Sequence, residues 1–140
     1  MNIQFFNEDV ELPRLDVERV KKWLNFIAKK HDKVVGDLSY IFCSDDYLLS
    51  VNRQYLDHDY LTDIITFDYT EGSIISGDVF ISTDRVSENA IEFNVSDDEE
   101  LLRVISHGVL HLIGFNDKNY ADQKVMTQQE NASILDYHNI

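Results

Sequence analysis

Apolar residues recur along this chain with two different spacings, and these spacings predict an alternation of strands and helices. Short runs rich in β-branched and aromatic residues predict strands at 2–6, 38–43, 63–69 and 74–82. A turn at Glu71 and Gly72 separates the last two runs and indicates a β-hairpin. A helix over 17–31 is predicted from apolar residues three or four apart, which share one helical face: Val17, Val20, Trp23, Leu24, Ile27 and Ala28.

Helix-capping residues mark where the predicted helices begin. A side-chain oxygen at such a position accepts a hydrogen bond from an unpaired amide of the first turn. Caps precede these helices: Asp16 before 17–31, Ser44 before 45–55, Ser96 before 97–113 and Asn119 before 120–136. Gly114 is the natural stop of the third of these helices. The acidic residues 97–100 are interpreted as its solvated first turn, and a further helix is predicted over 84–93.

The order of these elements predicts the fold class. Four strands and five helices that partly alternate indicate one sheet with helices packed mainly on one face, an α+β (mixed α/β) fold. Residues 1–140 are expected to form a single domain, since a chain of this length buries a sizeable core.

A pair of histidines near the end of the predicted helix 97–113 carries the candidate chemistry. His107 and His111 are four residues apart, so they lie on one face and can bind one metal ion. Their neighbours are apolar, and buried imidazoles need polar partners. A turn at Gly114 can bring Asp117 back as a third ligand, which leaves one position of a zinc ion open for water. The alternative is that the histidines bond nearby backbone groups and that Asp117 caps the next helix.

The same segment argues against a zincin-type peptidase. In those enzymes a glutamate follows the first histidine and acts as the general base. Here Gly108 occupies that position. A peptide hydrolase would therefore need a base from elsewhere in the chain.

Three blocks of sequence resemble the YbeY family of bacterial rRNA maturation factors. Residues 107–117 (HGVLHLIGFND) are similar to the family signature H-G-x-L-H-L-x-G-[YF]-D-H. Residues 52–55 (NRQY) and 61–67 (LTDIITF) are similar to N-x-x-Y-R and P-T-D-V-L-S-F, and residues 77–81 (GDVFI) to a G-D-I strand. The blocks occur in the family's order and span most of the chain.

The resemblance implies a four-stranded mixed sheet and a metal-dependent endoribonuclease specific for single strands. It implies a role in 16S rRNA 3′-end maturation and ribosome quality control. RNA, rRNA and the small ribosomal subunit with its proteins are the implied partners. Zn²⁺, one per chain, is the expected metal, held by His107, His111 and Asp117. Mn²⁺, Fe²⁺ or Ni²⁺ are alternatives that the ligand set accepts.

Two positions depart from the family pattern. Asp117 stands where the family usually has a third histidine, and a carboxylate is an accepted zinc ligand. Leu56 stands where the family has an arginine that contacts phosphate, so Arg53, one helical turn earlier, is the candidate for that contact. Arg85 and Arg103 are the substitutes if Arg53 is only a surface residue. Asp63 and His58 are further candidates for the cleft, because both lie in or beside the second block.

Composition limits the partners and the compartment. The net charge of −14 argues against an extended RNA footprint made by the surface as a whole, since phosphate neutralisation dominates RNA affinity. A local cleft with a metal and one or two arginines can still bind a phosphate, with partner proteins supplying further affinity. No apolar run is long enough for a membrane span, and residues 1–6 do not form a signal-peptide pattern. With one cysteine, Cys43, a cytoplasmic protein is expected.

Other functions remain open from the sequence alone. A metal hydrolase with another substrate would share the His107, His111 and Asp117 site. A non-catalytic ribosome-associated factor would keep the metal as a structural element, and Leu56 favours this interpretation. For the nuclease, the residues do not decide between attack by activated water and attack by the ribose 2′-hydroxyl.

Overall fold

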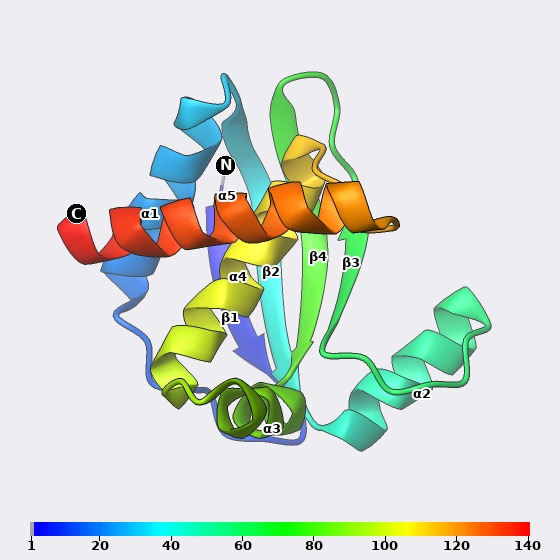
Figure 1. Ribbon diagram of the computed structural model, residues 1–140. Coiled ribbons are helices and arrows are strands. Elements are labelled where there is room, and N and C mark those ends of the chain that lie inside the picture. Colours follow the sequence, from blue (N-terminus) through cyan, green and yellow to red (C-terminus); the bar gives the residue numbers. More distant parts are fainter. Residues whose placement is uncertain (1) are drawn as a thin grey trace.

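The computed structural model describes residues 2–140 of the chain. Within this range the elements follow one another as strands and helices (Figure 1) in this order: β1 Asn2–Asn7, α1 Val17–Lys30, β2 Val34–Cys43, α2 Asp45–Leu56, β3 Ile64–Asp68, β4 Ile74–Ser82, α3 Thr83–Phe93, α4 Asp97–Ile113 and α5 Tyr120–Asn139. The predicted elements are all present, with boundaries shifted by a few residues.

The strands form one mixed sheet in the order β1-β2-β4-β3. β1 pairs with β2 and β2 pairs with β4 in parallel, whereas β3 and β4 are antiparallel. The β3–β4 connection is the predicted hairpin, and Gly72 in its turn has a φ of 59°, which glycine adopts without strain. The α+β fold with a four-stranded mixed sheet is therefore confirmed.

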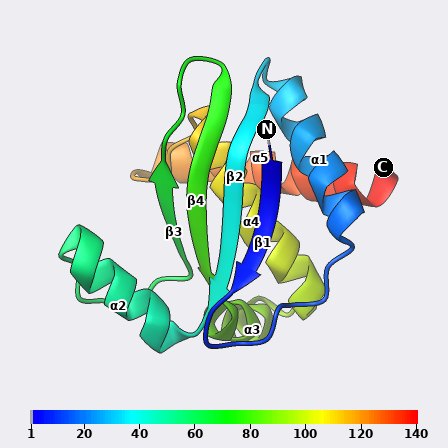
Figure 2. The same cartoon turned by 180° about the vertical axis from the view of Figure 1, so that it is seen from behind.

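Helices α1, α4 and α5 lie on one face of the sheet, and Figure 2 shows the other face with the strands in front. The side chains of α1 and α4 and of the strands interlock in one core around Trp23, Tyr40 and Ile105, all fully buried. Helix α2 packs beside the β3 edge and α3 at one end of the sheet (Figure 1). This arrangement leaves α4 lying across the sheet between the strands and α5.

Strand β2 is longer than its sequence pattern suggested. It begins at Val34, four residues before the predicted start, and pairs first with Ile74 of β4. A register shift between Val35 and Leu38 interrupts the pairing. Such a bulge breaks the alternation of inward and outward residues, so the pattern alone did not reveal the first part of the strand.

The predicted caps form, and their bonds are local. The side chains of Asp16, Ser44, Ser96 and Asn119 each accept a hydrogen bond from a backbone amide in the first turn of their helix. Gly114 ends α4 with a φ of 126°, which turns the chain back toward the helix. Among residues 2–140, no helix combines the length and the apolar character needed to cross a lipid bilayer.

One expectation about the start of α4 is wrong. Residues 97–100 were expected to be a solvated first turn, but Glu100 is only 3% exposed. Glu100 lies seven residues before His107 and so shares its helix face, and it borders a cavity that side chains of α3 and α5 also line. Glu100 is therefore a buried carboxyl rather than a surface charge.

Candidate active site

The site begins as a polar stripe on an otherwise buried helix. Between residues 100 and 112 of α4, the half-exposed positions are Arg103, His107 and His111, and the residues between them are buried. The three lie at steps of four residues and so share one face. The sequence argument for a common face of His107 and His111 is thus consistent with their position in the fold.

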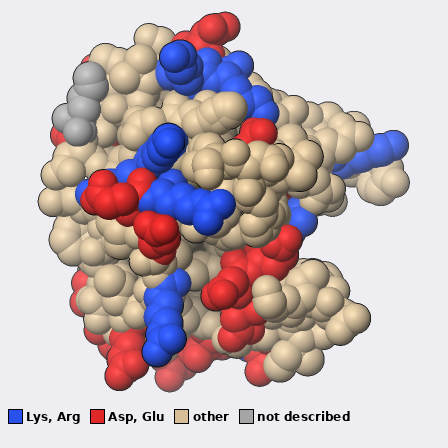
Figure 3. All heavy atoms as spheres, turned by 90° about the vertical axis from the view of Figure 1, so that its left-hand side faces the viewer, with Lys and Arg blue, Asp and Glu red and all other residues tan. Residues whose placement is uncertain are grey.

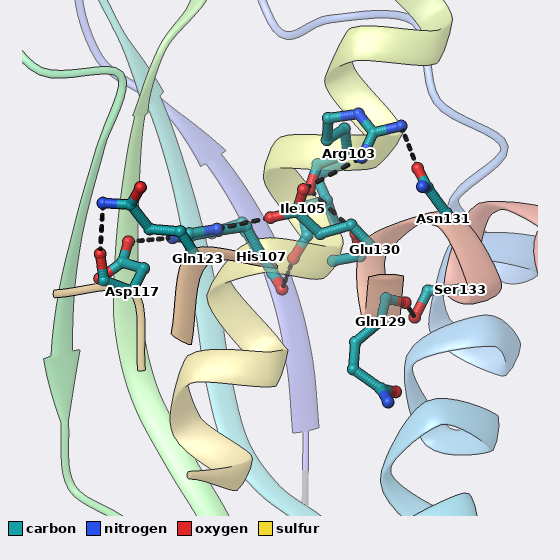
Figure 4. A network of polar contacts seen from close by, with 11 residues as sticks. Arg103, Ile105, His107, Asp117, Gln123, Gln129, Glu130, Asn131 and Ser133 are labelled. Carbon is teal, nitrogen blue, oxygen red and sulfur yellow. Dashed lines mark hydrogen bonds and ion pairs between the residues drawn. The ribbon is translucent and has the colours of Figure 1, made fainter. Parts of the chain in front are cut away.

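The turn after Gly114 brings Asp117 to His107. Oδ2 of Asp117 lies 3.2 Å from Nε2 of His107, and the two side chains point toward each other in Figure 4. Gln123, in the first turns of α5, donates from Nε2 to the backbone oxygen of Asp117 at 3.0 Å. The backbone of this turn is therefore tied to the helix that follows it.

A second carboxylate, which the sequence analysis did not identify, lies on the other side of the imidazole. Nδ1 of His107 is 2.7 Å from Oε2 of Glu130 on α5. Nη1 of Arg103 donates to Oε1 of the same carboxylate at 3.1 Å, and Nη2 donates to Oδ1 of Asn131 at 2.7 Å. Figure 4 shows these side chains as one connected network between α4 and α5.

A signal for Glu130 was present in the sequence. Met126, Glu130 and Ile134 are four residues apart on α5, and all three are buried. A carboxylate on the apolar stripe of a helix needs a buried polar partner. That position alone could have marked Glu130 as a site residue.

The charges around His107 favour its protonated form when no metal is bound. Burial of the ring opposes protonation, but the hydrogen bond and the negative charge of Glu130 outweigh it, together with the charges of Asp117 and Asp63. The pKa of His107 is therefore raised. Burial also raises the pKa of Asp63, which lies close enough to His107 to interact with it electrostatically.

The spacing of His107 and Asp117 fits a shared metal ion. Two ligand atoms bound at about 2.0–2.2 Å to a tetrahedral ion are roughly 3.3 Å apart, close to the observed 3.2 Å. The bond from Nδ1 to Glu130 leaves Nε2 to face the ion, as in carboxylate–histidine–metal sites. As placed, no three His, Cys, Asp or Glu side chains among residues 2–140 converge on one point, so His111 must approach for a complete ligand set.

The other predicted residues divide into two groups. Asp63 lines the same cavity as His107, of about 520 Å³, together with Arg103 and Glu130. Arg53 and His58 are not among the residues described as lining it. Arg53 forms an ion pair with Asp59, and His58 stacks on Tyr60, in exposed parts of α2 and of the loop after it.

Among the arginines, Arg103 lies at the site and Arg85 does not. Nε of Arg85 donates to Asp45 at 3.0 and 3.1 Å, which ties α3 to the start of α2. Arg103 lies one turn before His107 and borders the cavity. Basic side chains on the surface in Figure 3 form separate groups interspersed with acidic ones. Arg103 at the cavity is thus the arginine that lies nearest to His107 for binding a phosphate.

This chain, a mixed α+β domain whose site combines side chains of α4, of α5 and of the turn between them, matches known proteins over almost its whole length. The sequence profile of the family described as "Endoribonuclease YbeY" matches residues 2–138. Proteins of that name from Parabacteroides distasonis and Flavobacterium johnsoniae are 52% and 46% identical to the chain over 134 and 133 residues. These alignments cover 96% and 95% of the chain and 94% and 96% of the relatives.

A solved structure agrees with the observed fold. The solution structure of a Thermotoga maritima protein superimposes with a TM-score of 0.67 and 30% sequence identity. It covers 97% of this chain and 89% of the other. The chain belongs to the YbeY family, and the resemblance drawn from the three sequence blocks is confirmed.

Proposed function

We propose that this protein is a metal-dependent endoribonuclease that cleaves single-stranded RNA and acts in the maturation of the 16S rRNA 3′ end. Its membership of a family named for endoribonuclease activity supports the reaction class. The observation that carries the proposal is the pairing of His107 Nε2 with Asp117 at 3.2 Å, with Glu130 bonded behind the ring. These two side chains supply two of the donors that a divalent ion needs, beside a cavity that His107 lines.

The proposed metal ligands are His107, His111 and Asp117, with one Zn²⁺ per chain. When bound, such an ion supplies Lewis-acid chemistry, since it polarises a phosphodiester oxygen and activates water. With an ion bound, Glu130 would keep the proton of the neutral His107 ring on Nδ1, which would leave the lone pair of Nε2 for the ion. Arg103 holds Glu130 in turn, and Gln123 holds the backbone of Asp117.

Basic residues near the proposed metal ligands are the candidates for binding a phosphate of the RNA. Arg103 borders the cavity beside His107 and can offer a guanidinium edge to a phosphate oxygen. Arg53 remains a candidate for binding a more distant phosphate. Its ion pair with Asp59 is exposed, and exposed ion pairs contribute little to stability, so a phosphate can replace Asp59 as its partner. Asp63 is well placed to receive or release a proton near the reacting group, since burial raises its pKa.

The negative net charge of the chain affects how it binds RNA. A net charge of −14 limits the affinity for RNA that the protein achieves alone. We infer that rRNA is presented to it on the small ribosomal subunit, whose proteins supply the remaining binding surface, and that it acts in the cytoplasm and in ribosome quality control. Cleavage of free RNA is then expected to be slow and sensitive to salt.

The test is cleavage of a single-stranded RNA by zinc-loaded protein. His107→Ala is expected to reduce the rate on the order of a hundredfold or more, whereas His138→Ala, far along α5, serves as the matched control. Mass analysis of the product ends separates direct hydrolysis from 2′-hydroxyl attack, since only the latter passes through a cyclic phosphate. Zinc-loaded wild type that binds small subunits but cleaves neither free nor subunit-bound RNA would instead identify a non-catalytic factor.

A further inference from the structure

The cavity beside His107 continues along α4 well beyond the candidate metal ligands. It has a volume of about 520 Å³ and reaches the C-terminal end of α3. Side chains that can recognise a ligand line it: Asn89, Phe93, Glu100, Arg103, His107 and Glu130. Glu100 and His107 are seven residues apart on α4, or about 10 Å along the axis. The cavity thus extends by about one nucleotide from the place where the ion would act.

Glu100 is the unexplained group in this cavity. Its side chain is 3% exposed, and its Oε1 has no hydrogen-bond partner among residues 2–140. A buried carboxylate without a partner is strongly disfavoured, and such groups in folded proteins usually meet a ligand or fulfil another role. The nearest arginine on the helix, Arg103, is already bonded to Glu130 and Asn131. An N–H donor from a ligand would satisfy Glu100.

The charge of the lining indicates the type of ligand. Asp63, Glu100 and Glu130 place three carboxyl groups around the cavity against the guanidinium of Arg103. This excess of negative charge repels a phosphate at the end of the cavity near Glu100. The carboxyl groups do not converge as metal ligands within residues 2–140. The lining therefore suits a neutral group that donates hydrogen bonds. The base of a nucleotide is such a group, and the substrate of a nuclease contains it.

Phe93 supplies a surface for a planar ligand. It is the last residue of α3, lines the cavity and is 58% exposed, although it is a large aromatic side chain. Bases of single-stranded nucleic acids stack on such rings without regard to sequence. Stacking on Phe93 would direct the edge of a base toward α4.

We propose that this cavity is a base subsite that binds guanine next to the scissile phosphodiester, with Glu100 as the acceptor that recognises it. Of the four RNA bases, guanine presents two adjacent N–H donors, N1–H and N2–H, and these match the two oxygens of one carboxylate. Its neighbouring O6 accepts from a donor, and the side-chain amide of Asn89 in the same lining can provide one. The inference rests on the proposed nuclease function for the identity of the ligand.

Binding of free nucleosides tests the subsite without any cleavage. Amide chemical shifts of the ¹⁵N-labelled protein are followed during titration with guanosine and, in parallel, with uridine. The experiment is run at pH 8, because burial raises the pKa of Glu100 to about 7 and the carboxylate must be ionised. Guanosine is expected to shift residues that line the cavity and to bind about tenfold more tightly than uridine.

Variants identify the acceptor. Glu100→Gln is expected to remove the preference for guanosine, whereas Glu99→Gln, the neighbouring surface position, is expected to retain it. Phe93→Leu is expected to weaken the binding of both nucleosides. Thermal melting establishes that each variant is folded. Equal binding of guanosine and uridine by the wild type would overturn the proposal, as would a guanosine preference that survives in Glu100→Gln.

Cleavage of an oligouridylate that carries one guanosine separates this inference from the proposed function. Cuts concentrated beside the guanosine in the wild type, and spread evenly in Glu100→Gln, are the expected result. Even cutting by the wild type would contradict the subsite while leaving the nuclease function intact. Absence of any cleavage, with guanosine still preferred in the titration, would contradict the nuclease function and support the subsite.

Discussion

Oε2 of Glu130 lies 2.7 Å from Nδ1 of His107, so a carboxylate on α5 fixes which ring nitrogen of a histidine on α4 faces Asp117. Twenty-three positions separate the two residues in the chain. Arg103 bonds to the second oxygen of the same carboxylate. The imidazole is therefore oriented by a buried network rather than by its own helix.

Glu130→Gln is expected to weaken zinc binding about 10–100-fold, because a carboxylate behind a ligating histidine orients the ring and raises its basicity. Competition with a chromogenic chelator measures the affinity. Asp136→Asn is the control, since this residue lies on the same helix and pairs with Lys30, away from His107. An unchanged affinity in Glu130→Gln would mean that His107 does not bind the metal through Nε2.

The third ligand is tested by metal content after purification without added metal. Asp117→Ala is expected to lose most of the bound metal, whereas Asp117→His restores the family's usual histidine and is expected to retain it. Elemental mass spectrometry gives the stoichiometry. Asn116→Ala, one residue earlier in the same turn, is the matched control. Metal lost from Asn116→Ala but kept by Asp117→Ala would show that the ligand is the neighbouring residue.

The stability of the metal-free protein is expected to fall as the pH rises through neutrality. Burial raises the pKa of Glu100 from 4.5 to about 7, so between these values the folded state holds a proton that the unfolded state has released. Such a group favours folding fully below its unfolded pKa, and this contribution is lost as the pH rises through its folded pKa. The raised pKa of His107 acts in the same direction.

Glu100→Gln is therefore expected to raise the melting temperature by a few degrees at pH 8 and by less at pH 5. Thermal unfolding followed by circular dichroism, with a chelator present, makes the comparison. Asp98→Asn, at an exposed position in the same helical turn, is the control variant. A gain in stability that is the same at both pH values would contradict the raised pKa.

Gly77 allows β3 and α4 to approach β4 closely. A Cβ at this position would lie 2.5 Å from the backbone oxygen of Phe67 and 3.1 Å from Cδ2 of Leu112. Gly77→Ala is expected to lower the free energy of unfolding by about 2 kcal/mol or more, since the backbone of β3 has to move. Denaturation in urea provides the measurement.

Gly72→Ala is the comparison for this variant. Gly72 has a positive φ of 59° but no atom within 4 Å of an added Cβ, so only backbone strain opposes the change, by about 1 kcal/mol. A smaller loss at Gly77 than at Gly72 would show that the strands separate without difficulty.

Local spacing along the chain predicts the helices and strands and the shared helical face of the two histidines, because each depends on residues close together in the sequence. Period-two and period-3.6 patterns with caps at Ser96 and Asn119 defined strands and helices. A spacing of four residues placed His107 and His111 on one face of a helix, and Gly114 marked the turn that returns Asp117. The blocks of family residues identified the YbeY family before the fold was known.

Contacts between side chains far apart in the sequence follow from the packing of the helices. Packing of α5 on α4 brought Glu130 to His107 and buried Glu100, which the pattern of four acidic residues had suggested was solvated. It also placed Arg103 at the cavity and left Arg53 on α2 with Asp59. Contacts between elements depend on crossing geometry and side-chain packing rather than on spacing along the chain, so no periodicity in the sequence encodes them.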